Sequence, residues 1–146
     1  MTASERQTLT DLRRTLLHLH KTLLDWERTA YERLHGRVSG HELLHAILND
    51  PQFVWLRPVS ELIVRIDETL ENDFPAEAGG HGSPADLSAI IAQARTLVVP
   101  DEAGNRYAQR YHTALQEHPD AVFAHRGVRA VLKDVPEPKT PPERTH

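Results

Sequence analysis

Residues 4–36, SERQTLTDLRRTLLHLHKTLLDWERTAYERLHG, decide the fold class, because apolar residues follow the period of an α-helix along the whole stretch. They recur at alternating steps of three and four, at Leu9, Leu12, Leu16, Leu19, Leu23, Trp26 and Ala30. A second apolar line lies one position along, at Leu17, Leu24 and Tyr31. The apolar face is too wide for the seam of a two-stranded coiled coil. The stretch therefore predicts the central helix of a bundle, or a helix shared with a second subunit.

Both ends of this long helix carry recognisable signals. Ser4 followed by Gln7 matches a capping box, in which each side chain satisfies a backbone N–H of the first turn. Gly36 suits the position after the last turn, because glycine adopts the left-handed conformation without a Cβ penalty. A helix of roughly 30 residues is well above the common length and needs several packing partners.

A second helix is predicted to begin after Ser39. Ser39 is expected as its N-cap and Glu42 as the third helical residue of a capping box. Val38 and Leu43 stand at the two positions of a hydrophobic staple. Three start signals therefore agree on this boundary.

Prolines and the residues before them mark the later boundaries. Asp50 and Pro51 begin a short helical turn, and Pro58 separates it from the next helix. Further starts are expected at Ser83-Pro84, between Asp101 and Asn105, and at Pro119. The residues expected on buried faces are Leu44, Ile47, Leu48, Phe53, Val54, Trp55, Leu56, Val59, Leu62, Ile63, Ile66, Leu70, Leu87, Ile90, Ile91, Ala94, Leu97, Tyr107, Tyr111, Ala114, Leu115, Val122, Phe123, Val128, Val131 and Leu132.

These signals predict an all-α fold, a helical bundle of five to six helices with a long N-terminal helix. Residues 1–135 form one domain, with a mobile loop at about 72–82 that is rich in glycine. Residues 136–146 are expected to be a flexible, proline-rich, disordered tail, because they have almost nothing to bury. No segment shows the signal of a β-hairpin.

Composition excludes several classes of protein. The chain has 146 residues, of which 39% are hydrophobic and 26% charged, and no apolar run is long enough to span a membrane. With no cysteine it forms neither disulfides nor thiolate metal sites. The net charge is −4 and basic residues alternate with acidic ones, which argues against binding to nucleic acid. The first residues lack the apolar core of a secretory signal, so we expect a cytoplasmic protein.

One short motif points to chemistry. His41-Glu42-Leu43-Leu44-His45 matches H-E-x-x-H, in which two histidines one helical turn apart bind zinc and the glutamate acts as general base. His41 and His45 are therefore candidate ligands for zinc or another divalent transition metal. Glu42 is the alternative catalytic residue, and Glu61 or Glu68 would have to supply a third ligand.

A structural reading of the same motif is favoured. The capping box already accounts for Glu42 and the staple for Leu43, and the residues after His45 lack the glycine and third histidine of the extended peptidase motif. A mononuclear site in a helical bundle stays open as an alternative. Its histidines would come from a pool of six: His18, His20, His41, His45, His112 and His125.

Three blocks of the sequence resemble one known family. They are Leu23–Arg28, Phe53–Glu68 and His118–His125, and the likeness extends over most of the chain outside the loop and the tail. In these blocks the chain is similar to a family of small uncharacterised bacterial all-helical proteins. The resemblance implies a bacterial, cytosolic setting. It brings no activity and no functional residue, because none is assigned to the family.

Three hypotheses on function follow. The first is a non-enzymatic helical protein that acts in interaction or regulation through protein contacts, as a homodimer, because the long first helix has a wide apolar face. The second is a metal-binding bundle or zinc hydrolase that uses His41, Glu42 and His45. The third is a sensor of a small ligand whose loop at Gly79–Gly82 acts as a lid.

Overall fold

The computed structural model describes residues 1–73 and 84–135, and every element in these ranges is a helix. There are seven of them in the described part, one more than the upper bound that we predicted, because the short turn before Pro58 is a helix of its own. Their bounds are α1 Ala3–His35, α2 Gly40–Asn49, α3 Pro51–Val54, α4 Arg57–Glu71, α5 Pro84–Leu97, α6 Arg106–Glu117 and α7 Pro119–Lys133. The all-α prediction is confirmed.

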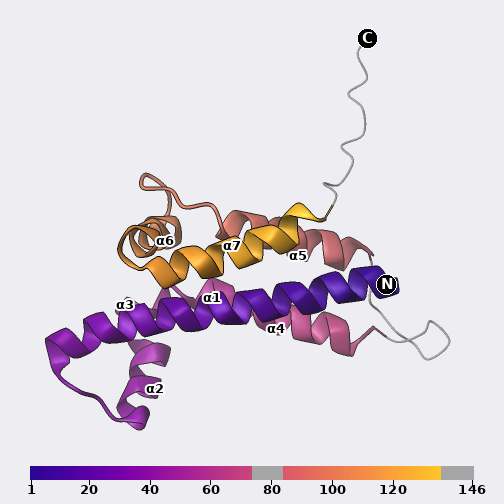
Figure 1. The fold of residues 1–146 in the computed structure, drawn as a ribbon. Coiled ribbons are helices and arrows are strands. Elements are labelled where there is room, and N and C mark those ends of the chain that lie inside the picture. Colours follow the sequence, from indigo (N-terminus) through magenta and orange to yellow (C-terminus); the bar gives the residue numbers. More distant parts are fainter. Residues whose placement is uncertain (74–83, 136–146) are drawn as a thin grey trace.

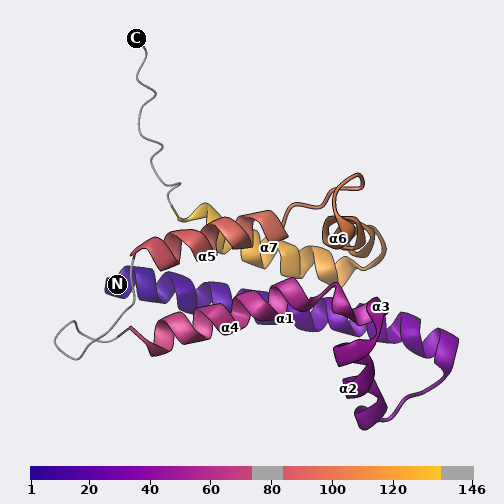
Figure 2. The ribbon, with the colours of Figure 1, turned by 180° about the vertical axis from the view of Figure 1, so that it is seen from behind.

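Four of the helices form the body of the protein. α1 packs against α4 and α7, and α5 packs against both of these, so that the four close into a ring. Their directions alternate along the chain, which makes an up-down-up-down four-helix bundle (Figures 1 and 2). α2 and α3 are inserted between the first and second helices of the bundle, and α6 between the third and fourth.

The prediction of a long N-terminal helix that packs in a bundle is confirmed. α1 is 33 residues long, and its leucine stripe lies in the main core. Its cap differs from the prediction: Thr2, not Ser4, is the N-cap, and Thr2 and Glu5 form the reciprocal capping box. Gly36 ends the helix with φ of +77°, and its N–H bonds to the Glu32 carbonyl, as expected of a left-handed glycine.

Other boundaries agree with the sequence signals. Asp50 caps α3, Asn105 caps α6, and Pro119 begins α7. Pro58 stands in the first turn of α4. Backbone N–H groups of the first turn have no acceptor within the helix, so a proline there costs no helical hydrogen bond. The predicted loop falls mostly on 74–83 and the predicted tail on 136–146; both lie outside the described residues, as do the lid and the Ser83 cap.

The core consists of one cluster that all four bundle helices and α6 enter. Most residues predicted to be buried lie in it or against it. Phe123 is a clear exception: it is 65% exposed on α7, whereas Ala121 and Ala124 beside it are buried. Because Ala121 and Ala124 are small, α7 packs close to α1. The phenyl ring of Phe123 lies on the opposite side of α7. Among the described helices, none is both long and apolar enough to cross a membrane.

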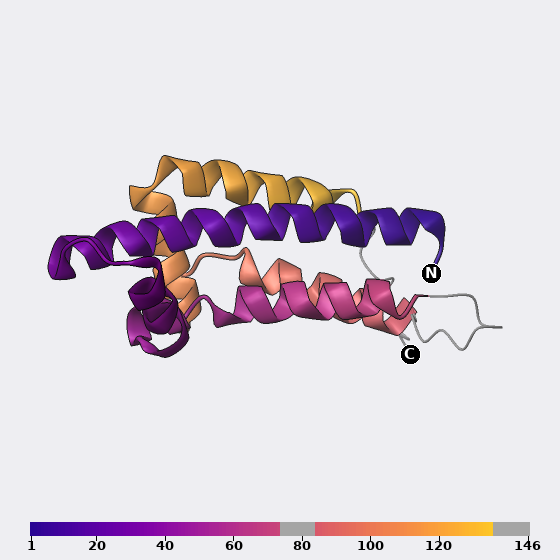
Figure 3. The same cartoon turned by 90° about the horizontal axis from the view of Figure 1, so that it is seen from below.

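α2 is the least integrated helix. It packs mainly on α3 and stands away from the bundle, at the end where α1 overhangs its neighbours (Figures 1 and 3). Ala46 is the only residue of α2 that is buried. The end of α1 is similarly open, since Leu34 is 79% exposed. This end of the molecule therefore shows apolar side chains that the fold itself does not use.

Candidate functional site

The predicted metal pair lies on a side of α2 that faces solvent. Leu44 and His45 lie three and four residues after His41, and Leu48 lies four and three residues after them, so the four share one side of the helix. All four are exposed, with Leu44 at 56% and Leu48 at 58%. The prediction that Leu44 and Leu48 are buried is therefore wrong. We call these four residues the outward face of α2.

Glu42 belongs to the first turn of α2. Its backbone N–H donates to Ser39 Oγ at 3.2 Å, which confirms Ser39 as the N-cap. The Glu42 side chain is exposed. Its carboxylate suits this place because negative charge near a helix N-terminus is favourable. The second half of the predicted capping box is not formed among the described residues, because the Glu42 carboxylate has no hydrogen bond to the Ser39 N–H, so only its charge favours a glutamate here.

His41 and His45 are a pair, not a complete site. In the ranges 1–73 and 84–135, no three side chains of His, Asp or Glu gather closely enough to hold a metal ion. Glu61 and Glu68 are exposed on α4 and form no such group with the pair. His18 is exposed, as expected, and His20 is half-buried, where burial lowers its pKa. One chain therefore offers two imidazole ligands on the outward face.

The most deeply buried charge is Glu27 on α1. Its side chain has no exposed surface, and both carboxylate oxygens are used. Oε2 accepts from the Trp55 indole N–H at 2.6 Å, and Oε1 accepts from the Arg110 guanidinium at 2.6 Å. A buried carboxylate is tolerated when an opposite charge and further donors satisfy it. Glu27 therefore joins α1 to α6 and to the segment between α3 and α4.

Further contacts hold this ion pair in place. The Arg110 guanidinium lies 4.6 Å from the centre of the Trp26 ring, a cation–π geometry. The Gln52 side-chain amide donates to the Glu27 carbonyl at 3.2 Å. The alternation of acidic and basic residues in the sequence did not indicate that Glu27 is buried. Its position four residues after Leu23, in line with the leucine stripe, is the signal that could have revealed it.

An aromatic row runs from this ion pair toward α7. Trp55 lies against Tyr107, Tyr107 stacks on Tyr111, and Tyr111 contacts the ring of His125, with ring centres 5.5, 5.7 and 5.5 Å apart. Tyr107 and Tyr111 are buried and His125 is half-buried. The row therefore ends at an imidazole that reaches the surface.

Tyr111 and His125 share a hydrogen bond, with the phenol oxygen 2.5 Å from His125 Nδ1. Burial raises the pKa of Tyr111, so the phenol stays protonated. Burial, with the nearby charges of Arg129 and Arg126, lowers the pKa of His125, which favours the neutral ring. In the tautomer whose Nδ1 accepts from Tyr111, the imidazole carries its hydrogen on Nε2. In that tautomer His125 is a donor at its other nitrogen.

Tyr107 and Tyr111 allow a matched test of the hydrogen bond between Tyr111 and His125. The Tyr107 hydroxyl is buried without a hydrogen-bond partner among the described residues, whereas that of Tyr111 is bonded. We expect Tyr107→Phe to raise the free energy of unfolding by about 1 kcal/mol and Tyr111→Phe to lower it by about 1–2 kcal/mol. Urea unfolding of both variants measures this. Equal losses in the two would show that Tyr107 has a partner too.

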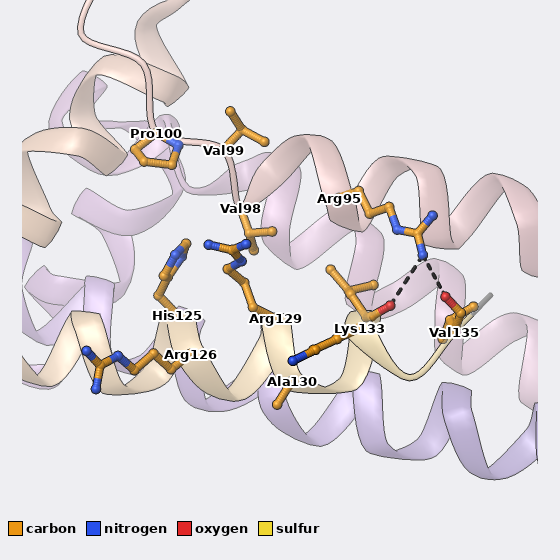
Figure 4. Close-up of a pocket in the computed structure, with 11 residues that line it drawn as sticks. Arg95, Val98, Val99, Pro100, His125, Arg126, Arg129, Ala130, Lys133 and Val135 are labelled. Carbon is orange, nitrogen blue, oxygen red and sulfur yellow. Dashed lines mark hydrogen bonds between the residues drawn. The ribbon is translucent and has the colours of Figure 1, made fainter. Parts of the chain in front are cut away.

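A basic hollow lies where His125 reaches the surface. It has a volume of about 990 Å³ and lies between the end of α5, residues 98–100 and α7. Arg129 and His125 extend from α7 toward these residues, while Arg126 points away (Figure 4). Lys133 and Arg95 complete the cations at its rim. We call this site the basic hollow. The sequence alone gave no reason to distinguish its arginines from those on other solvent-exposed helix faces.

In comparisons with known proteins, no family model, no curated protein and no solved structure matches this chain. The predicted resemblance to a bacterial family therefore stands only as far as its fold class, a small all-helical protein. The function has to be argued from the outward face of α2, the buried ion pair and the basic hollow.

Proposed function

We propose that this protein is a non-enzymatic helical interaction protein, and that it associates with a second copy of itself through the outward face of α2. The observation that carries the proposal is the exposure of Leu44 and Leu48, one turn apart on a helix that buries only Ala46. Large apolar side chains gathered on one face in this way are typical of a docking surface. Leu34, exposed at the same end of the molecule, extends the apolar surface.

The composition of the face suits a homodimer. A two-fold axis brings a face against its own copy, so any charge on it meets a like charge. The outward face carries no Asp, Glu, Lys or Arg. Burying a leucine contributes about 1.5–3 kcal/mol before the costs of association, so a few leucines per subunit support a dimer of roughly micromolar affinity.

This basis for a homodimer differs from the one that the sequence offered. The wide apolar face of the first helix suggested a helix shared with a second subunit. In the structure part of its second line is used within the chain, since Leu24 packs against the core and Tyr31 against Phe53, whereas Leu17 is 39% exposed. The proposed contact therefore moves from the middle of α1 to α2.

Charge reversal of the face tests the proposal. Leu44→Glu and Leu48→Glu each place a carboxylate against its own copy, and we expect them to weaken dimerisation at least tenfold. Val64→Glu is the matched control, because Val64 is 53% exposed but lies on α4. Sedimentation velocity from about 1 to about 200 μM measures the monomer–dimer equilibrium. A wild-type chain that stays monomeric, or equal weakening by Val64→Glu, would contradict the proposal.

A metal-bridged form of this dimer is the second candidate, because His41 and His45 lie on the same face as the two leucines. Zinc prefers four ligands in a tetrahedron, and two copies of the pair would supply four imidazoles. Such a site has no open position for water, so it would be structural and would leave Glu42 no catalytic task. Zinc that tightens the wild-type dimer but not a His41→Gln/His45→Gln dimer supports it; no response to zinc speaks against it.

A further inference from the structure

The basic hollow concentrates cations in a chain that is acidic overall. The protein has 17 Lys and Arg against 21 Asp and Glu, yet four cationic residues line this one hollow. No acidic side chain stands among the described residues that line it. The described side chains that line the hollow therefore carry a net positive charge.

Three of the four cations have no partner within residues 1–73 and 84–135. Arg126, Arg129 and Lys133 form no hydrogen bond or ion pair with any described residue, whereas arginines elsewhere, such as Arg28 and Arg110, hold carboxylates. They recur at steps of three and four along α7, so they share one side of the helix. Arg129 and Lys133 lie one helical turn apart, and like charges in this position repel one another unless an anion lies between them.

Arg95 has a different role at the same rim. Its guanidinium donates to the carbonyls of Leu132 and Val135, at 3.3 and 3.0 Å. Leu132 lies in the last turn of α7 and Val135 just beyond it, where the end of a helix carries partial negative charge. Arg95 offsets this charge and fixes the end of α5 to α7. The repulsion that the end of α7 would exert on an anion is thereby reduced.

The inner side of the hollow adds a neutral donor and an apolar wall. His125 is bonded to Tyr111 at Nδ1, which leaves Nε2 for a ligand, and Nε2 donates in the tautomer whose Nδ1 accepts from Tyr111. Val98, Val99 and Pro100 form the opposite side, where Val99 is 58% exposed (Figure 4). A ligand that fits both sides carries a compact multiple negative charge on an apolar body.

We propose that the basic hollow binds a small phosphomonoester with an apolar body. A phosphate dianion can accept from two or three cations at once, whereas a single carboxylate balances only one. Arg129 and Lys133 bind the phosphate, His125 donates to one of its oxygens, and the apolar body lies on Val98, Val99 and Pro100. The proposal is independent of the association proposed for α2.

Phenyl phosphate is a suitable probe of the full chain at about pH 7.5, where the phosphate is a dianion. Titration followed by ¹H–¹⁵N NMR should give saturable shifts confined to residues near 95–99 and 125–135. Inorganic phosphate should bind more weakly because it lacks the apolar body, and phenol should not bind. Shifts that do not saturate, or binding of phenol equal to that of phenyl phosphate, would overturn the proposal.

Two charge-removing variants and a control complete the test. Arg129→Gln and Lys133→Gln should each weaken phenyl phosphate binding at least tenfold, and both side chains are exposed, so the fold should be unaffected. Arg14→Gln removes an arginine that is 72% exposed on α1, away from the hollow, and should bind like the wild type. Equal weakening by all three variants, or shifts at the hollow with a DNA oligonucleotide but none with phenyl phosphate, would overturn the proposal.

Discussion

Glu27→Ala is expected to lower the free energy of unfolding by about 3–5 kcal/mol, a large share of the stability of a domain of this size. The substitution removes the acceptor of two hydrogen bonds at once. It leaves the Trp55 indole N–H buried without its partner and Arg110 without its carboxylate. It also leaves unfilled space, because the Glu27 side chain is fully buried.

A glutamate on the same helix provides the control for this prediction. Glu32 also pairs with an arginine, Arg28 at 3.0 Å, but this pair lies at the surface. We expect Glu32→Ala to change the stability by less than about 1 kcal/mol, because exposed ion pairs contribute little. Chemical denaturation of both variants measures the difference. A cost of Glu27→Ala as small as that of Glu32→Ala would show that Glu27 is not a buried, paired charge.

The partner of Glu27 gives an independent check. Arg110→Met leaves the carboxylate buried without an opposite charge and should also be strongly destabilising. When both are replaced, as Glu27→Leu with Arg110→Met, no charge stays unpaired. The free energy of unfolding of the double variant should therefore fall by much less than the sum of the two single decreases. Additive losses would contradict direct pairing.

Leu16→Ala is the second substitution with a large expected effect. Leu16 has no exposed surface and lies in the leucine stripe of α1, where α4 and α7 pack on the same helix. Truncation removes buried methyl groups and leaves a cavity, so we expect a loss of about 2–5 kcal/mol. The urea concentration at the midpoint of unfolding should fall. The slope of the free energy of unfolding against urea concentration should stay the same.

The next residue in the chain is its matched control. Leu17 is 39% exposed, and Leu17→Ala should cost less than about 1 kcal/mol, because little buried surface is lost. The two leucines differ mainly in the side of α1 on which they lie. Similar losses in both variants would mean that the leucine stripe is not the side of α1 that the bundle buries.

The fold could be predicted to a large extent because its signals are local. Helical spacing in α1, the glycine after it and the prolines at later boundaries each depend on a few neighbouring residues. The count of helices failed because α3 is a single turn, whose independence depends on its packing. The N-cap of α1 was misplaced by two residues because Thr2 and Ser4 stand before equally suitable partners.

Burial on particular faces was harder to predict. Leu44, Leu48 and Phe123 stand at helical spacing, yet they are exposed because no neighbouring helix covers that side of α2 or α7. Glu27 shows the converse, a charged residue in the core because Arg110 and Trp55, far away in sequence, satisfy it. A pattern within one helix does not show what lies opposite it.

The candidate sites depend on the same missing information. The pair His41 and His45 is visible in the sequence, but its exposure and the lack of a third ligand in the described part of the chain are not. The basic hollow joins α7 to the end of α5, and Arg126, Arg129 and Lys133 stay unpaired there because no acidic side chain stands among the described residues that line it. Neither property follows from spacing.

The association proposed for α2 can be tested most directly by single-cysteine crosslinking. The chain contains no cysteine, so Leu48→Cys provides one thiol, and a two-fold contact through the outward face brings it close to its own copy. Val64→Cys on α4 is the control. We predict that mild oxidation converts Leu48→Cys to a disulfide-linked dimer much faster than Val64→Cys at the same concentration. Equal, slow crosslinking of the two variants would contradict a dimer formed through α2.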